Sequence, residues 1–205
     1  PMNSSAASDV YKRQILEDIM EEYPDKFTLV KSPDEISNEK GVLQVVYGME
    51  NGAPIESNLS NIKLFSDIGI NYITLAHSKS NHISDSSYDE NKNWGGLSPF
   101  GREVVAEMNN QGVMIDISHV SDAAFYEVLK LSKTPVIASH SSLRHFVPGF
   151  ERNVSDDMLK ELAKNGGVIQ ICFGSEFIGE YRKYPELVIT VKDVADHIDR
   201  VKELF

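Results

Sequence analysis

The sequence is poor in cysteine, in basic residues and in long apolar stretches, and each shortage excludes a class of protein. A single cysteine, Cys172, in 205 residues excludes an internal disulfide. No apolar run approaches the roughly 20 residues that a membrane-spanning helix needs. Lysine and arginine number 20 against 31 acidic residues, which gives a net charge of -11. Because nucleic-acid binding depends on clustered basic side chains, we expect no nucleic-acid partner.

A glycine-rich phosphate-binding loop of the form G-x-G-x-x-G is also missing, whereas short apolar segments alternate with helical patterns. Five segments have the composition of buried strands, namely residues 42–49, 72–76, 113–118, 135–139 and 168–173. Helical spacing follows them in segments that start at Leu59, Ser98, Ser121, Ser155 and Thr190. This alternation predicts an α/β fold with a parallel sheet, and both an open doubly wound sheet and a (β/α)8 barrel fit it.

The residues at the strand ends favour the barrel. Four consecutive predicted strands end in side chains that can bind metals or carry protons: Glu50, His77, His119 and His140. Barrel enzymes keep their active sites at the carboxyl-end rim, whereas a doubly wound sheet concentrates its site at one switch point, commonly with the missing glycine-rich loop. A full barrel has eight strands in typically ~250 residues. Five strands therefore predict an incomplete TIM-type barrel.

One carboxylate and two neutral imidazoles at neighbouring strand ends form a suitable ligand set for Zn²⁺ or a similar divalent ion. Glu50, His119 and His140 are therefore the candidate metal ligands. A metal held there would lower the pKa of a bound water to ~7 and polarise a carbonyl group, as amide hydrolysis requires. The alternative for each histidine is a hydrogen bond to the rim. For His77, the spacing leaves metal binding, substrate binding and a structural role open.

Other polar residues also have two interpretations. Asp116 lies inside a predicted strand, where an unpaired charge is unfavourable, so it either pairs structurally or orients a metal ligand. Arg152 is either a surface residue or a group that grips a carboxylate. The long polar segment 78–96 is predicted to be a lid or a rim loop. Three further histidines are predicted to face solvent: His82, His145 and His197.

From about Ile15 to Phe205 the chain contains the motif blocks YGMENG, YITLAHS, GLSPFGREVV, MIDISHVSD, PVIASHSS, RNVSDD, NGGVI and VADHIDRVKEL. In this order the blocks resemble the membrane (renal-type) dipeptidases and their bacterial relatives, which are peptidase family M19 of the amidohydrolase superfamily. The resemblance implies a (β/α)8 barrel with two zinc ions. It also implies hydrolysis of a dipeptide substrate by a hydroxide that bridges the metals.

The resemblance further implies a role for each matching residue. Glu50, in YGMENG, matches the carboxylate that bridges both zinc ions, and His119 and His140 match the further ligands of one zinc. His77, in LAHS, matches the catalytic histidine that contacts the substrate and helps to hold the tetrahedral intermediate. Arg152, in RNVSDD, matches the arginine that contacts the substrate carboxylate.

Two parts of the family pattern are missing from this sequence. These are the His-x-Asp motif of the first strand, which ligates the other zinc, and the aspartate of the eighth strand, which acts as catalytic acid or base. Residues 15–205 match strands three to seven, so we expect a piece that is truncated at both ends, holds at most one well-liganded zinc and is inactive by itself. Two alternatives stay open: another amidohydrolase-type activity, such as that of a lactonase or deacylase, and a non-catalytic binding protein that kept the fold.

The first residues differ in character from the rest. Residues 1–14 lack periodicity, and the heptapeptide SDVYKRQ matches one translated frame of the mosaic end of a transposon-based sequencing adapter. We predict a non-native leader over residues 1–14 and a partial metallo-dipeptidase barrel domain over residues 15–205. For assembly and location, a homodimer is compatible with the resemblance and a cytoplasmic address is favoured.

Overall fold

The computed structural model describes residues 14–38 and 40–205, which form two parallel sheets. The predicted leader therefore lies, except for its last residue, outside the described residues. The larger sheet contains five strands in chain order, β3 (Tyr47–Glu50), β4 (Ile70–Thr74), β5 (Met114–Asp116), β6 (Ile137–Ser141) and β7 (Val168–Ile171). All neighbours in this sheet are parallel, which confirms the predicted α/β arrangement.

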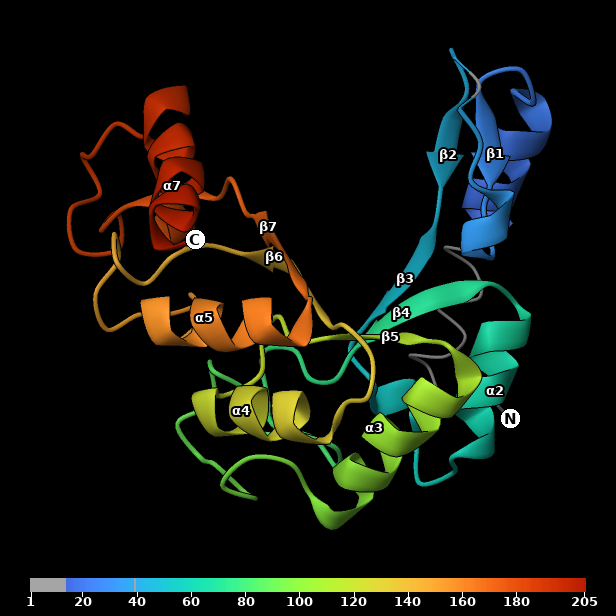
Figure 1. Cartoon of the computed structure of the whole chain (residues 1–205), viewed down its shortest axis with the longest axis horizontal. Coiled ribbons are helices and arrows are strands. Elements are labelled where there is room, and N and C mark those ends of the chain that lie inside the picture. Colours follow the sequence, from blue (N-terminus) through green and yellow to red (C-terminus); the bar gives the residue numbers. More distant parts are fainter. Residues whose placement is uncertain (1–13, 39) are drawn as a thin grey trace.

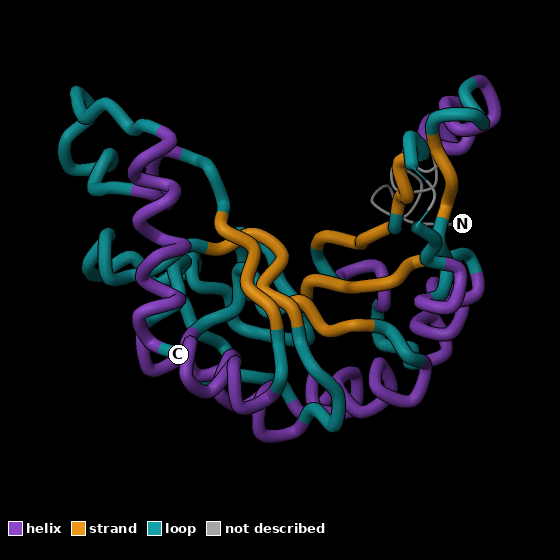
Figure 2. The backbone as a smooth tube through the Cα atoms, turned by 45° about the horizontal axis from the view of Figure 1, so that its top comes forward, coloured by secondary structure: helices purple, strands orange, loops and turns teal. Residues whose placement is uncertain are grey.

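The helices cover the convex side of this sheet, and the strands line the inner side of an open arc (Figure 2). Four helices connect successive strands and lie in a row beneath the sheet in Figure 1: α2 (Ser60–Asp67), α3 (Pro99–Gln111), α4 (Asp122–Leu131) and α5 (Asp156–Asn165). After β7 come α6 (Ser175–Ile178) and α7 (Val191–Leu204). This sequential, curved arrangement is part of a (β/α)8 barrel.

The hydrophobic core occupies the layer between the sheet and its helices. Ile73 of β4 and Ile115 of β5 are fully buried there, together with Val104, Met108 and Phe125 from the helices. Burial of such side chains supplies most of the folding free energy, at about 25 cal/mol per Å² of apolar surface. The core therefore holds the strands in register and places their carboxyl ends along one edge.

Helix starts follow the predicted capping residues. The hydroxyl groups of Ser98, Ser121 and Ser155 each accept a backbone N–H of the first turn, from Gly101, Ala124 and Met158. Thr190 and Asp193 form the predicted capping box of α7. Each such cap contributes about 1 kcal/mol. Helix α3 ends at Gln111 and is capped by Gly112, whose left-handed φ of 69° suits glycine.

The single strand predicted over residues 42–49 is wrong, because the chain changes partner at Val46. Its first part is β2 (Leu43–Val45), which pairs with β1 (Phe27–Leu29) in a separate two-stranded sheet. Its second part is β3, which pairs with β4 after a register shift between Tyr47 and Gly48. Figure 1 shows β1 and β2 projecting from the main sheet, beside a helix formed by residues 14–22.

The structure also corrects the predicted strand ends. Strand β4 ends at Thr74 and β5 at Asp116, so His77 and His119 each follow their strand after two further residues. His140 lies inside β6. At β5 the reason is local, because the Asp116 carboxylate accepts the Ser118 N–H at 3.0 Å and so turns the chain out of the strand.

The prediction that His197 faces solvent is wrong, because its side chain is fully buried. The Leu143 N–H donates to Nδ1 at 3.0 Å, and Nε2 lies 2.9 Å from the Ile178 carbonyl oxygen. Because Nδ1 accepts, the ring is neutral and its hydrogen is on Nε2. Burial lowers the pKa of His197, although the Ile178 carbonyl and the nearby carboxylates raise it. This residue joins α7 to the loop after β6 and to α6.

The other two histidines predicted at the surface differ from each other. His145 is exposed, as predicted. His82 is half-buried and stacks on Phe100, with ring centroids 5.5 Å apart. In the described part of the chain, no helix has the length and hydropathy to span a membrane.

The burial of His197 generates a prediction about stability and pH. Replacing His197 with alanine should lower the free energy of unfolding at pH 7.5 by about 2–4 kcal/mol, because two buried backbone groups lose their partner. The unfolded ring binds a proton near pH 6.5 and the folded ring only at lower pH. Stability conferred by His197 should therefore decrease as pH falls below about 6.5.

Urea unfolding of the natural protein and its His197→Ala variant between pH 5 and 8 measures this dependence. The groups near the ring that also titrate or carry charge are Asp193, Asp196 and His145. His145→Ala serves as the control, because it removes an exposed histidine from the same region. If the His197→Ala variant keeps the full pH dependence of the natural protein, the assignment of a buried neutral ring is wrong.

Candidate metal centre

The four side chains predicted at the strand ends, those of Glu50, His77, His119 and His140, converge at one edge of the sheet. Glu50 Oε1 lies 3.0 Å from His140 Nε2, 3.2 Å from His119 Nε2 and 3.6 Å from His77 Nε2. The Nε2 atoms of His119 and His140 are 2.8 Å apart. The structure therefore brings together the end of β3, the loops after β4 and β5, and β6.

This set of atoms fits a divalent metal ion. Ligand atoms of Glu50, His77 and His119 all lie within 4.8 Å of one another. His140 Nε2 is closer to the Glu50 carboxylate than either of the other imidazoles. Imidazole nitrogen and carboxylate oxygen are the ligands that Zn²⁺ and related ions take at about 2.0–2.2 Å. Three histidines thus surround Glu50, and the position of His77 keeps both of its functional interpretations open.

The rings of His119, which is buried, and of His140, which is half-buried, are held in the neutral form that can bind a metal. Burial, the Arg152 guanidinium and the neighbouring imidazoles lower the pKa of His119 to about 2. Burial and Arg152 also lower the pKa of His140, against the opposing effect of Asp116 and Glu50. A neutral imidazole offers a nitrogen lone pair, so both rings can act as ligands.

Asp116 is fully buried and supports His140 through Ser139. Its Oδ1 accepts two backbone N–H groups, and its Oδ2 accepts the hydroxyls of Thr74 at 2.6 Å and Ser139 at 2.5 Å. Because the Ser139 hydroxyl donates to Asp116, its oxygen is available to accept from His140 Nδ1, 2.8 Å away. His140 Nε2 then carries no hydrogen and faces Glu50. The geometry thus matches both interpretations of Asp116, structural pairing and orientation of a histidine.

The backbone at His119 has a rare conformation. Its φ of 71° is in the left-handed region, which costs a residue other than glycine about 1–3 kcal/mol. The Ser87 N–H donates to the His119 carbonyl oxygen at 2.7 Å, and Ser86 forms an antiparallel bridge with Val120. These contacts hold the His119 ring, which is 7% exposed, against the other two histidines.

Arg152 is not a surface residue, since only 3% of it is exposed. Its Nη1 donates to the Ser141 hydroxyl at 2.8 Å and its Nη2 to the His140 carbonyl at 2.7 Å. The guanidinium lies 5.1 Å from the ring centroid of Phe177, and within the described ranges its buried Nε finds no hydrogen-bond partner. The Arg152 guanidinium is thus a buried cation whose hydrogen-bond partners are neutral oxygens, and it lies beside the candidate metal ligand His140. It is suited to bind an anionic group of a ligand.

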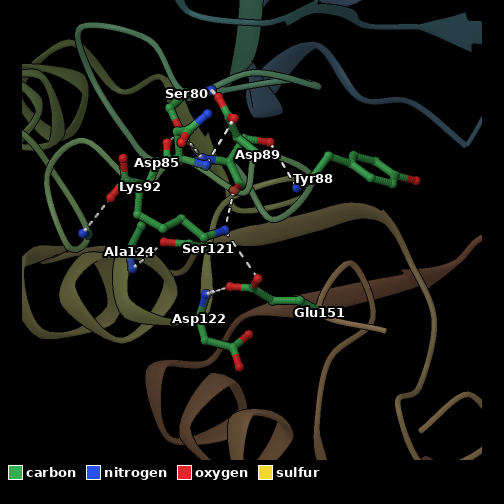
Figure 3. Close-up of polar contacts among 12 residues, drawn as sticks. Ser80, Asp85, Tyr88, Asp89, Lys92, Ser121, Asp122, Ala124 and Glu151 are labelled. Carbon is green, nitrogen blue, oxygen red and sulfur yellow. Dashed lines mark hydrogen bonds and ion pairs between the residues drawn. The ribbon is translucent and has the colours of Figure 1, made fainter. Parts of the chain in front are cut away.

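Residues 78–96 form a rim beside His77 that is fixed by its own hydrogen bonds (Figure 3). The buried Asp85 carboxylate accepts the backbone N–H groups of Asn93, Trp94 and Gly96 at 2.7–3.2 Å. The Ser86 hydroxyl donates to the His77 carbonyl oxygen. Of the two predicted alternatives, this arrangement is a rim loop. The role of Asp85 was not predicted, because no local pattern in a polar segment shows which acidic side chain will accept the backbone N–H groups of the loop.

The fold and this group of residues define a barrel protein with a candidate metal site at the carboxyl ends of its strands. The sequence model of the membrane dipeptidase family, peptidase family M19, matches residues 7–205. The chain belongs to this family, which confirms the resemblance that its motif blocks indicate.

Individual relatives agree with this assignment. Dipeptidase tcpJ of Claviceps purpurea is 38% identical over 186 residues, which are 90% of this chain and 43% of that protein. Dipeptidase 3 of Mus musculus is 34% identical over 184 residues, 88% of this chain and 36% of that protein. The crystal structure of an amidohydrolase from Pseudomonas aeruginosa superposes with a TM-score of 0.86 at 28% identity, covering 97% of this chain and 59% of that one. The chain thus spans less than half the length of these two dipeptidases.

The contacts of Asp116 predict a large effect on stability. Asp116→Ala leaves the donors of Thr74, Ser118 and Ser139 without an acceptor, so the free energy of unfolding should fall by about 3–5 kcal/mol. Urea unfolding measures the change. Asp157→Ala is the control, because that side chain is 82% exposed, and it should change stability by less than about 0.5 kcal/mol. Equal effects of the two substitutions would contradict this account of Asp116.

Proposed function

We propose that the protein containing this chain is a zinc-dependent dipeptidase. In this proposal the chain provides one metal site and the site for the terminal carboxylate of the substrate. The supporting observation is that Glu50 Oε1 lies within 3.2 Å of the Nε2 atoms of His119 and His140, beside the buried Arg152. The relatives named as dipeptidases add support. Because the chain spans 43% and 36% of their lengths, the activity is proposed for the protein at its full natural length.

Glu50, His119 and His140 are the proposed zinc ligands, since two imidazoles and a carboxylate suit this ion. When bound, zinc supplies a Lewis acid and a water whose pKa is near 7. The Glu50 side chain is 50% exposed, so its carboxylate is accessible to a second ion. Within residues 14–38 and 40–205, the group around Glu50 is the one cluster of histidine and acidic side chains suited to a metal. Ligands for a second ion would have to come from the rest of the barrel.

His77 and Arg152 are proposed to bind the substrate from two sides. Of the three imidazole nitrogens, His77 Nε2 is the farthest from Glu50, at 3.6 Å. Its Nδ1 lies 3.0 Å from the Ser78 hydroxyl, which can donate to Nδ1 when the ring carries its hydrogen on Nε2. His77 can then donate from Nε2 to the oxygen that gains charge as the peptide carbonyl is attacked. Arg152 holds the carboxylate of the same substrate.

The buried Arg152 also favours a dipeptide over the substrates of the alternative functions. A lactone or an acylated amine need not carry a free carboxylate. Without such an anion, the buried guanidinium would keep an unpaired Nε and have no charged partner from the substrate, which is unfavourable. Dipeptide hydrolysis is therefore favoured over lactonase and deacylase activity.

Metal dependence is the first test. The full-length protein should hydrolyse members of a dipeptide panel, lose this activity with a chelator and regain it with Zn²⁺. His140→Ala should lower turnover by at least roughly 100-fold, because it removes a ligand of the metal that activates water. His145→Ala, which changes an exposed histidine five residues away, should have no effect. The 205-residue chain alone should show no turnover, and metal-independent hydrolysis by the full-length protein would refute the proposal.

Recognition of the carboxylate is the second test. Arg152→Met should raise KM for a dipeptide by roughly 10- to 100-fold, because a charge-assisted hydrogen bond to the substrate is lost. The same dipeptide with a C-terminal amide lacks this interaction, so its weaker hydrolysis should change little. Steady-state kinetics on both substrates makes the comparison. Equal losses of hydrolysis for the acid and the amide would show that Arg152 does not bind the substrate carboxylate.

A further inference from the structure

A second arginine, Arg144, holds the backbone on both sides of Arg152. Its Nε donates to the Asn153 carbonyl oxygen at 2.9 Å, and its Nη2 donates to the Glu151 carbonyl oxygen at 3.0 Å. These two residues are the immediate neighbours of Arg152 in the chain. One guanidinium therefore binds the peptide groups that flank the proposed carboxylate-binding residue.

Arg144 is itself attached to helix α4. Its Nη1 and Nη2 each donate to one oxygen of the Asp122 carboxylate, both at 2.6 Å. Asp122 is the first residue of α4, directly after the capping residue Ser121. The Arg144 side chain is 20% exposed, so this two-pronged ion pair is partly shielded from water. The planar fork of arginine makes all four bonds at once, whereas the ammonium group of lysine cannot reproduce this geometry.

The side chain of Glu151 connects the same loop to the rim loop beside His77 (Figure 3). Glu151 Oε1 accepts the Asp122 N–H at 3.0 Å, and Oε2 lies 3.1 Å from Lys92 Nζ. Lys92 Nζ also donates to the Ser86 carbonyl oxygen at 2.5 Å, and the Ser86 hydroxyl contacts the His77 carbonyl. A continuous series of polar contacts thus joins the two loops that are proposed to bind the substrate.

We propose that Arg144, held by Asp122, is a positioning residue. It sets the position of the Arg152 guanidinium relative to the proposed metal ligands. The inference rests on the proposed function, in which Arg152 binds the substrate carboxylate. The Arg152 guanidinium lies at the end of a flexible side chain and makes two hydrogen bonds of its own. The position of this guanidinium therefore depends on the backbone at residue 152. An error of about 1 Å in such a contact costs up to roughly 100-fold in rate.

The test compares Arg144→Lys with Arg200→Lys in the full-length protein. Arg200 is a matched control, since its Nη2 pairs with Asp156 at 2.5 Å and the two side chains are 25% and 28% exposed. This pair joins α7 to α5, and Arg200 Nη1 also pairs with Glu203 of α7, so both partners lie on helices and not in the loop 142–155 that carries Arg152. Arg144→Lys should raise KM for a dipeptide at least roughly 10-fold, with a smaller change in kcat. It should leave hydrolysis of the C-terminal amide nearly unchanged, and Arg200→Lys should leave both reactions unchanged.

The outcomes separate this inference from the proposed function. If Arg152→Met weakens hydrolysis of the acid and of the amide equally, the proposed role of Arg152 fails. If Arg152→Met weakens hydrolysis of the acid selectively but Arg144→Lys behaves like Arg200→Lys, the positioning role fails. Equal losses of acid and amide hydrolysis in Arg144→Lys would also overturn it, because they indicate a general structural defect.

Crystal structures of the variants provide a readout that does not depend on turnover. Arg144→Lys should displace the Arg152 guanidinium from the position that it keeps in Arg200→Lys. Asp122→Asn replaces Arg144→Lys if the latter does not fold, because it weakens the same ion pair while keeping an oxygen acceptor. An unmoved Arg152 guanidinium in the folded variant would overturn the inference, whether or not the protein is active.

Discussion

The buried carboxylate of Asp116 is the constraint on which the rest of the site depends. Its two oxygens accept hydrogen bonds from Thr74 of β4, from Ser118 after β5 and from Ser139 of β6. A charge in this position is tolerated only because every bond is made. The same bonds end β5 and orient His140 through the Ser139 hydroxyl. One side chain therefore fixes three neighbouring strands and one proposed metal ligand.

Around this centre, the loops are held by charged groups bonded to backbone atoms. Asp85 accepts hydrogen bonds from three N–H groups of the rim loop. Arg144 donates hydrogen bonds to the carbonyl oxygens of the two residues that flank Arg152. Such contacts place a loop more firmly than exposed ion pairs do, because the partners are part of the main chain and partly excluded from water. The proposed binding groups His77 and Arg152 thus stand on supported loops rather than on free ones.

Much of the architecture was predictable because its causes are local. The serine caps of α3, α4 and α5 and the capping box at Thr190 depend on residues three positions apart, and the structure shows each of them. The change of partner at Val46 was not predictable, because an apolar run looks the same whether it pairs with one strand or two. His197 was misjudged for a related reason, since its partners Leu143 and Ile178 are distant in the chain.

The sequence by itself determined the parallel α/β order, the helix boundaries and the identity of the four polar residues near the strand ends. These follow from short-range periodicity and from the rule that parallel strands present their carboxyl ends on one side. Only the tertiary structure decided that three imidazoles surround Glu50, that Arg152 is buried, and that Arg144 supports it. Those facts depend on distances between segments far apart in the chain, which burial and hydrogen bonding set only when the whole sheet is assembled.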